Sequence, residues 1–175
     1  MPWEIDPHYT SVEFSVKHLM IAFIKGRFPQ VSGTFHLDPQ RPETSWVKVQ
    51  IKMDSIYTGI PQRDAHLRSA DFFEAVKYPT SIFESTEVKP VNSNSFLVQG
   101  NLSLHGVTRP ILFQAVYTGM NRDPYTEAYH AGFAASATIN RRDFGITFNQ
   151  TNKEGIILIG YEVLLENHLE AVFVG

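Results

Sequence analysis

The chain has 175 residues, a length typical of one domain, and we expect residues 1–175 to fold around a single core. Its formal net charge is −3 and its 15 Lys and Arg residues are scattered, which argues against a nucleic-acid partner. It has no cysteine, so disulfides, thiol chemistry and thiolate metal sites are excluded.

The N-terminal region lacks the basic, apolar and small-residue blocks of a signal peptide. No apolar run approaches the roughly 18 residues needed to span a bilayer. The sequence therefore predicts a cytoplasmic protein, or a periplasmic one if a signal peptide has been removed.

Strand patterning dominates the first third of the chain. Three segments alternate between apolar and polar residues, which predicts half-buried strands at 11–18, 31–38 and 46–53. His18 falls on the apolar face of the first of these segments. A lone imidazole there is either a hydrogen-bond partner for a ligand or a core histidine that a neighbour satisfies.

The segment from Pro61 to Pro79 breaks the alternation and carries residues with helical tendency. Asp64 is expected to cap one short helix, and Ser69 with Phe73 to form another. We therefore expect a short helical insertion around residues 63–74 that covers the mouth of a barrel.

Strand patterning returns after this insertion. A weaker strand at 81–88 precedes a predicted hairpin of 96–105 and 111–117 with a tight His105-Gly106 turn. The last two strands are expected at 131–139 and from residue 157 to 165 or beyond.

Eight strands with short connections predict an all-β fold, an antiparallel sheet that packs on a second sheet or closes into a barrel. An eight-stranded barrel either fills with side chains or holds one small ligand. Small inward residues such as Ala135 leave room for a ligand, whereas Phe14, Phe35 and Phe113 are large enough to fill it. Both a cavity and a filled core are compatible with the pattern.

Ordered matches to a known family run through most of the chain. They begin in WEIDPHYTSVEFSVKH, are densest in PQRDAHLRSADFF from Pro61 to Phe73, and continue to NRRDFG at Asn140 to Gly145. With these motifs the chain resembles the YceI-like family of lipocalin-like polyisoprenoid-binding proteins. The resemblance implies an extended eight-stranded antiparallel β-barrel with an inserted helix, and a long hydrophobic pocket along the barrel axis.

The resemblance further implies a ligand such as an isoprenoid quinone, a polyprenyl phosphate or pyrophosphate, or a similar amphiphilic lipid. The expected role is lipid transport, storage or metabolism, with transient membrane contact, a homodimeric state and no cofactor apart from the bound lipid. The residues expected to line the tunnel are Phe14, Val16, His18, Phe35, Val49, Ile51, Leu67, Phe72, Leu102, Leu104, Phe113, Phe133, Ala135, Ile139, Ile159 and Tyr161.

Polar residues of the insertion are candidates for contact with a lipid headgroup, namely Arg63, Asp64, His66 and Arg68. The alternative for this group is an internal salt-bridge network that fixes the insertion to the barrel. A buried ion pair between Arg141 and Asp143 is expected at one end of the barrel.

Two other functions are compatible with the sequence. One is an enzyme that acts on an isoprenoid lipid through His18 or His66, and the other is a dimeric scaffold with a filled core. Because the chain has no nucleophile elbow, no HExxH motif and no locally paired histidines, we expect neither catalytic residues nor a metal site. A metal site would have to be assembled from distant strands.

Overall fold

The computed structural model describes residues 2–175, which form one continuous antiparallel sheet with short helical segments. The strands are β1 (Pro2–Ile5), β2 (Ser11–His18), β3 (Ala22–Arg27), β4 (Val31–His36), β5 (Trp46–Lys52), β6 (Thr80–Pro90), β7 (Ser95–Leu104), β8 (Val107–Arg122), β9 (Tyr129–Asn140) and β10 (Ile159–Phe173). The helical segments are η1 (Pro7–Tyr9), η2 (Pro42–Thr44), η3 (Met53–Ser55), α1 (Pro61–Arg68) and η4 (Arg141–Phe144).

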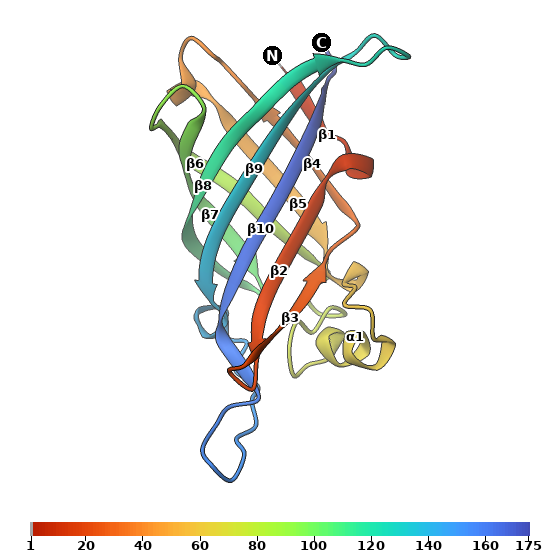
Figure 1. Ribbon diagram of the computed structural model, residues 1–175, viewed down its shortest axis with the longest axis vertical. Coiled ribbons are helices and arrows are strands. Elements are labelled where there is room, and N and C mark those ends of the chain that lie inside the picture. The colour runs from red at the N-terminus through yellow and green to blue at the C-terminus, as the bar shows by residue number, and fades with distance from the viewer. Residues whose placement is uncertain (1) are drawn as a thin grey trace.

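The sheet closes into an elongated barrel (Figure 1). The order around the ring is β1-β4-β5-β6-β7-β8-β9-β10, and β1 also pairs with β10, which completes the circle of eight strands. The predicted eight-stranded antiparallel barrel with a helical insertion is therefore confirmed.

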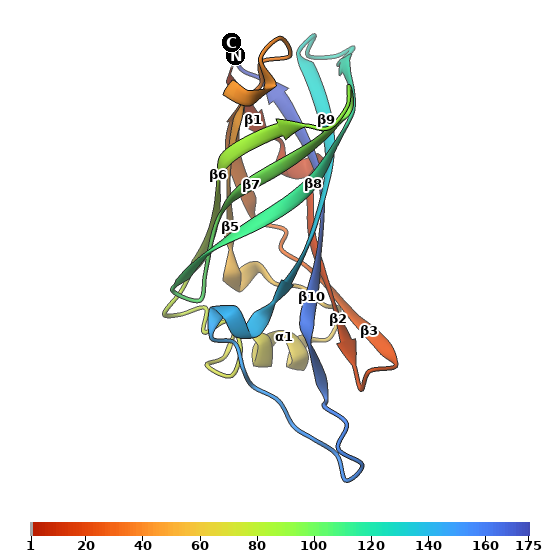
Figure 2. The same cartoon turned by 90° about the vertical axis from the view of Figure 1, so that its left-hand side faces the viewer.

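The two strands outside the ring, β2 and β3, are present because β10 extends beyond its pairing with β1. Residues Ile159 to His168 of β10 pair with β2, and Ala171 to Phe173 pair with β1, so that β1 and β2 follow one another along the same edge. β3 pairs with β2 and forms a hairpin that leaves the barrel wall (Figure 2).

Neither β1 nor β3 was predicted from the sequence. β1 has only four residues, too few to show alternation, and β3 has both faces largely in solvent, with only Gly26 buried. Among residues 2–175 no helix has the length and apolar composition needed to cross a bilayer.

The insertion between β5 and β6 lies at the barrel end opposite β1 (Figures 1 and 2). α1 starts with Pro61 at its first position, where the missing N–H costs no hydrogen bond, and Ile60 is its N-cap. The prediction that Asp64 caps the helix is wrong, because Asp64 is the fourth residue of α1. Its carboxylate accepts hydrogen bonds from the backbone N–H and the hydroxyl of Thr58. The prediction of a second short helix at Ser69 and Phe73 is also wrong, because residues 69–77 form turns and bends.

The turn at His105-Gly106 has the predicted two-residue form. Leu104 pairs directly with Val107, and both turn residues have positive φ values, 54° for His105 and 73° for Gly106. Positive φ at both central residues is the type I′ geometry that matches the twist of a hairpin.

Buried apolar residues form separate clusters along the barrel axis. One cluster, around Met53, Phe72 and Phe144, packs the insertion onto the barrel end. Another, around Trp3 and Phe35, lies at the β1 end. A third cluster, of Phe83, Phe113 and Ala137, shares partly buried neighbours with both.

Candidate ligand-binding cavity

A cavity of about 250 Å³ lies inside the barrel and is lined almost entirely by apolar side chains. Its lining reaches from Leu37 and Trp46, at the β1 end, to Leu67, Phe72 and Ile146 at the α1 end. The cavity is close to the roughly 300 Å³ at which small-molecule pockets begin. Side chains therefore do not fill the interior of the barrel completely.

All but two of the residues predicted to face the tunnel line this cavity. They are Phe14, Val16, Phe35, Val49, Ile51, Leu67, Phe72, Leu102, Leu104, Phe113, Phe133, Ala135, Ile139 and Ile159. The alternation of side chains on β2, β4, β5, β7, β8 and β9 accounts for most of them, because successive residues of a strand point to opposite faces. Their contact with a ligand stays a prediction.

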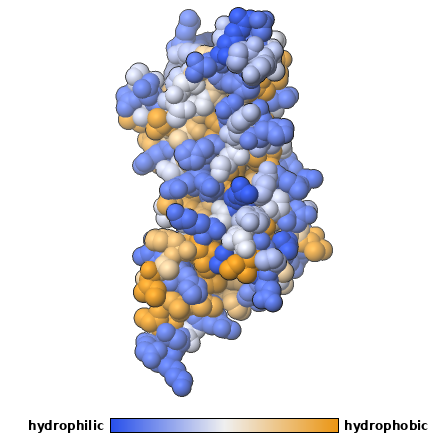
Figure 3. Space-filling view, turned by 45° about the vertical axis from the view of Figure 1, so that its right-hand side comes forward, coloured by the Kyte–Doolittle hydropathy of each residue, from blue (hydrophilic) through white to orange (hydrophobic). Residues whose placement is uncertain are grey.

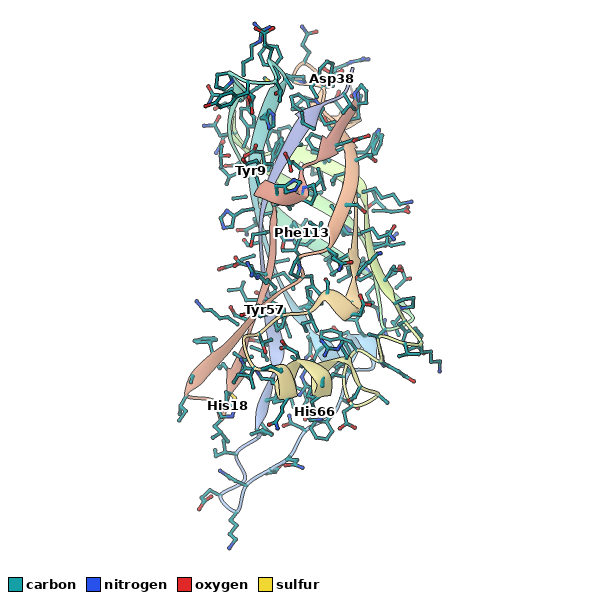
Figure 4. The ribbon with its side chains drawn as sticks, turned by 90° about the vertical axis from the view of Figure 1, so that its right-hand side faces the viewer. Tyr9, His18, Asp38, Tyr57, His66 and Phe113 are labelled. Atoms are coloured by element: carbon teal, nitrogen blue, oxygen red, sulfur yellow. The ribbon has the colours of Figure 1, made fainter. Side chains whose placement is uncertain are left out.

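His18 does not line the cavity. It is the last residue of β2, where the β2–β3 hairpin has left the barrel wall, and Figure 4 shows it to one side of the barrel, whereas Phe113 lies within it. The alternating pattern continues along β2, but no opposite wall faces its final residue.

Tyr161 also lies outside the cavity lining. A shift in register between Ile159 and Val163 interrupts the alternation of β10 at this point. The Tyr161 ring instead packs beneath two guanidinium groups, with its centroid 4.7 Å from Cζ of Arg141 and 4.0 Å from Cζ of Arg142.

Several lining residues were missed. Val98 and Leu165 follow the alternation of strands that were predicted correctly, so the pattern contained the signal for them. Phe28, Phe73 and Ile146 come from connecting segments, where no periodicity indicates which way a side chain points.

Arg141 is a charged residue in the cavity lining, and only 5% of it is exposed. Its guanidinium donates hydrogen bonds to the backbone carbonyls of Gly160 (2.9 Å), Ile146 (2.9 Å) and Ile159 (3.2 Å). The predicted ion pair with Asp143 is wrong, because Asp143 is exposed and the guanidinium turns inward to these carbonyls. Burial lowers the pKa of Arg141 from its ordinary value, since desolvation disfavours the charged form.

No carboxylate within residues 2–175 forms an ion pair with Arg141. A positive charge compensated only by carbonyl dipoles and aromatic rings therefore stands at the α1 end of the apolar cavity. Such a charge attracts an anionic group on a ligand more strongly than it would in water.

A smaller pocket of about 60 Å³ adjoins the cavity at the same end. It shares Val16, Leu67, Phe72 and Ile159 with the cavity and adds the polar side chains of Arg63 and His66. Figure 4 shows His66 on α1 at this end of the barrel.

Two of the four headgroup candidates therefore meet at this pocket. Arg63 donates to the hydroxyl (2.8 Å) and carbonyl (2.7 Å) of Thr58, and His66 Nε2 lies 2.8 Å from Asp71 Oδ2. Asp64 is buried with its carboxylate held by Thr58, and Arg68 lines neither pocket. The alternative, a salt-bridge network that fixes the insertion to the barrel, does not describe these contacts: those at Thr58 are hydrogen bonds, and the ion pair of His66 with Asp71 lies within the insertion.

Comparison with known proteins identifies the family. The model of the YceI-like domain matches residues 3–171. The chain belongs to the YceI-like family. Curated relatives include UPF0312 proteins of Pseudomonas savastanoi pv. phaseolicola, 42% identical, and Pseudomonas aeruginosa, 45% identical; each match extends over 135 residues, 77% of this chain and 70% of the relative.

Solved structures share the barrel of this YceI-like chain. BcnA of Burkholderia cenocepacia has a TM-score of 0.83 at 20% identity, covering 95% of this chain and 98% of BcnA. A YceI protein of Campylobacter jejuni has a TM-score of 0.77 at 29% identity, covering 91% and 90%. A polyisoprenoid-binding domain of Saccharophagus degradans has a TM-score of 0.71 at 17% identity, covering 97% of each chain.

Proposed function

We propose that this YceI-like protein binds a long isoprenoid lipid, such as a quinone or a polyprenyl phosphate, with the chain in the barrel cavity. The observation that carries the proposal is the apolar cavity that reaches through the barrel towards one buried cation. The polyisoprenoid-binding domain of Saccharophagus degradans, which has the same fold, supports an isoprenoid over other apolar molecules.

The energetics suit an extended apolar chain such as an isoprenoid. Each buried methylene contributes roughly 0.8 kcal/mol, and association costs roughly 4 to 15 kcal/mol in lost freedom of motion. A few buried isoprene units therefore offset the cost of binding without specific polar contacts. Affinity then increases with the length of chain that the cavity encloses.

The α1 end is the proposed position of the headgroup. Arg141 faces the cavity there, and Arg63 and His66 line the adjoining small pocket. Guanidinium groups match phosphate oxygens in geometry and charge, which favours a phosphate or pyrophosphate at this end.

Lipid delivery requires contact with a membrane, and the β2–β3 hairpin is the proposed contact. Its tip carries Met20, Ile21 (86% exposed) and Phe23 (61% exposed), and Lys17 and Lys25 are also exposed on this hairpin. Figure 3 shows apolar side chains gathered on the lower part of the molecule. Exposed apolar residues next to basic ones are typical of segments that lie in the interface of anionic membranes.

The first test is to purify the untagged protein without detergent, extract it with organic solvent and measure bound lipid by mass spectrometry. About one prenylated lipid per chain is expected. Ala135→Phe, which fills the cavity, should lose the lipid, whereas Ala134→Phe on the outer face of the same strand should retain it.

Lipid retained at full stoichiometry in folded Ala135→Phe would contradict the proposed location. Protein that carries no lipid and takes up no added polyprenyl lipid would contradict the function itself.

The pairing of His66 with Asp71 favours a second candidate, an enzyme that acts on the bound lipid. A carboxylate that orients an imidazole is a common feature of general bases. The change His66→Ala separates the two candidates through turnover of an added lipid. If the parent protein converts the lipid and the variant does not, the protein is an enzyme, and if neither converts it, the protein only binds the lipid.

A further inference from the structure

Three side chains that are far apart in the sequence meet on the outer wall of the barrel, near β1. They are Asp6, which follows β1, His130 on β9, and Glu170 on β10. One potential ligand atom from each lies within 4.8 Å of those of the other two, and His130 Nδ1 is 2.8 Å from Glu170 Oε1.

The backbone holds these side chains in place. The N–H of Asp6 donates to the carbonyl of Glu170 at 2.8 Å, and the Glu170 N–H donates to the Thr10 hydroxyl at 3.2 Å. His130 on β9 pairs with Val172 on β10, two residues along the strand from Glu170. The arrangement is therefore set by strand pairing rather than by flexible loops.

The cluster is negatively charged. Within residues 2–175 neither Asp6 nor Glu170 forms an ion pair with a lysine or arginine, and the basic groups beside them are imidazoles. His8 is one of these, with Nδ1 3.2 Å from Asp6 Oδ1. The side chains are partly buried, with 18% of Asp6 and of His130 and 35% of Glu170 exposed, which makes two unbalanced carboxylates more costly than in open solvent.

The donor atoms match a particular class of ion. One imidazole nitrogen and two carboxylate oxygens, with a second imidazole adjacent, are the ligands that Zn²⁺ and neighbouring divalent transition metals prefer. Tetrahedral Zn²⁺ with bonds of about 2.1 Å holds its ligand atoms about 3.4 Å apart, so small side-chain rotations suffice.

We propose that Asp6, His130 and Glu170 form a binding site for a divalent transition metal ion, with Zn²⁺ as the reference ion and His8 or water as the fourth ligand. The ion joins the segment after β1 to β9 and β10. Because β1 has four residues and closes the ring between β4 and β10, the ion reinforces the seam of the barrel. The site is outside the lipid cavity, so it does not depend on the lipid-binding proposal.

The test is Zn²⁺ titration of untagged, chelator-treated full-length protein by calorimetry, combined with thermal unfolding. One Zn²⁺ per chain at micromolar or tighter affinity is expected, together with a higher Tm. Loading the same protein with Co²⁺ in place of Zn²⁺ should give the visible absorption band typical of tetrahedral Co²⁺.

The changes His130→Gln and Glu170→Gln should each weaken binding at least tenfold, while circular dichroism and bound lipid are unchanged. His168→Gln, an exposed histidine on the same strand as Glu170, is the matched control and should bind as the unchanged protein does. Absence of binding at 100 µM Zn²⁺, or equal affinity in His130→Gln, would overturn the proposal.

Discussion

Asn167 on β10 lies opposite Ala135 on β9, and both residues line the cavity. The Asn167 side-chain oxygen is buried and has no hydrogen-bond partner in the described part of the chain. A polar atom in this state reduces stability because it has lost water without gaining a partner.

Replacing this side chain with an apolar one of similar size should therefore stabilise the protein. We expect Asn167→Leu to raise the free energy of unfolding by about 1 kcal/mol. Urea unfolding of lipid-free protein measures the change, and a lower stability in Asn167→Leu would show that the oxygen has a partner, such as a bound water.

Gly106 combines a positive φ of 73° with a close neighbour, since a Cβ atom built there would lie 2.6 Å from the Tyr78 ring. Gly59 also has a positive φ, 88°, but its Cβ would meet nothing within 4 Å. Gly59→Ala therefore measures backbone strain alone, about 1 kcal/mol, and Gly106→Ala should cost more. Equal losses in thermal or urea unfolding would mean that the Tyr78 ring moves aside freely.

The β2–β3 hairpin should determine attachment to membranes. The double change Ile21→Ser and Phe23→Ser removes the most exposed apolar side chains of its tip and should abolish co-sedimentation with vesicles that contain anionic phospholipid. Tyr125→Ser is the control, because this 95% exposed residue lies on the β8–β9 connection at the opposite end. If both variants sediment as the unchanged protein does, membrane contact lies elsewhere.

Asp123 should contribute to the pH dependence of stability. Backbone N–H groups of Thr126 (3.0 Å) and Tyr125 (2.7 Å) donate to its carboxylate and hold its pKa below the ordinary 3.8. With the folded pKa lower than the unfolded one, this stabilisation is present above pH 3.8 and is lost as the pH falls through the folded pKa.

Asp123→Asn keeps an acceptor oxygen but does not titrate. Urea unfolding should find the variant less stable than the parent at pH 7, with the difference shrinking at acidic pH. A difference that does not change with pH would mean that hydrogen bonding, rather than charge, distinguishes the two side chains.

Strict alternation is the reason that most of the barrel could be predicted. It depends on one face being buried, so it identified the strands that form the wall and most residues of the cavity. The prediction failed where that condition is not met. His18 lies beyond the opposite wall, Tyr161 lies within the register shift of β10, and β3 is exposed on both faces.

Polar relationships were harder to predict because they depend on tertiary positions. Arg141 and Asp143 are neighbours in the sequence, yet the guanidinium turns inward to carbonyls of distant residues. Asp6, His130 and Glu170 come together only once β1 pairs with β10. No local spacing indicates either arrangement.

The pairing of Trp3 with Phe173 joins the first strand of the sheet to the last. During synthesis β1 leaves the ribosome before all other strands, but its partner β10 is made after the rest of the ring. Trp3 can pair early with Phe35 of β4, but its contact with Phe173 has to wait until β10 has been made. Barrel closure therefore follows the synthesis of β10, and until then the partner edges of β1 and β2 are exposed to non-native pairing.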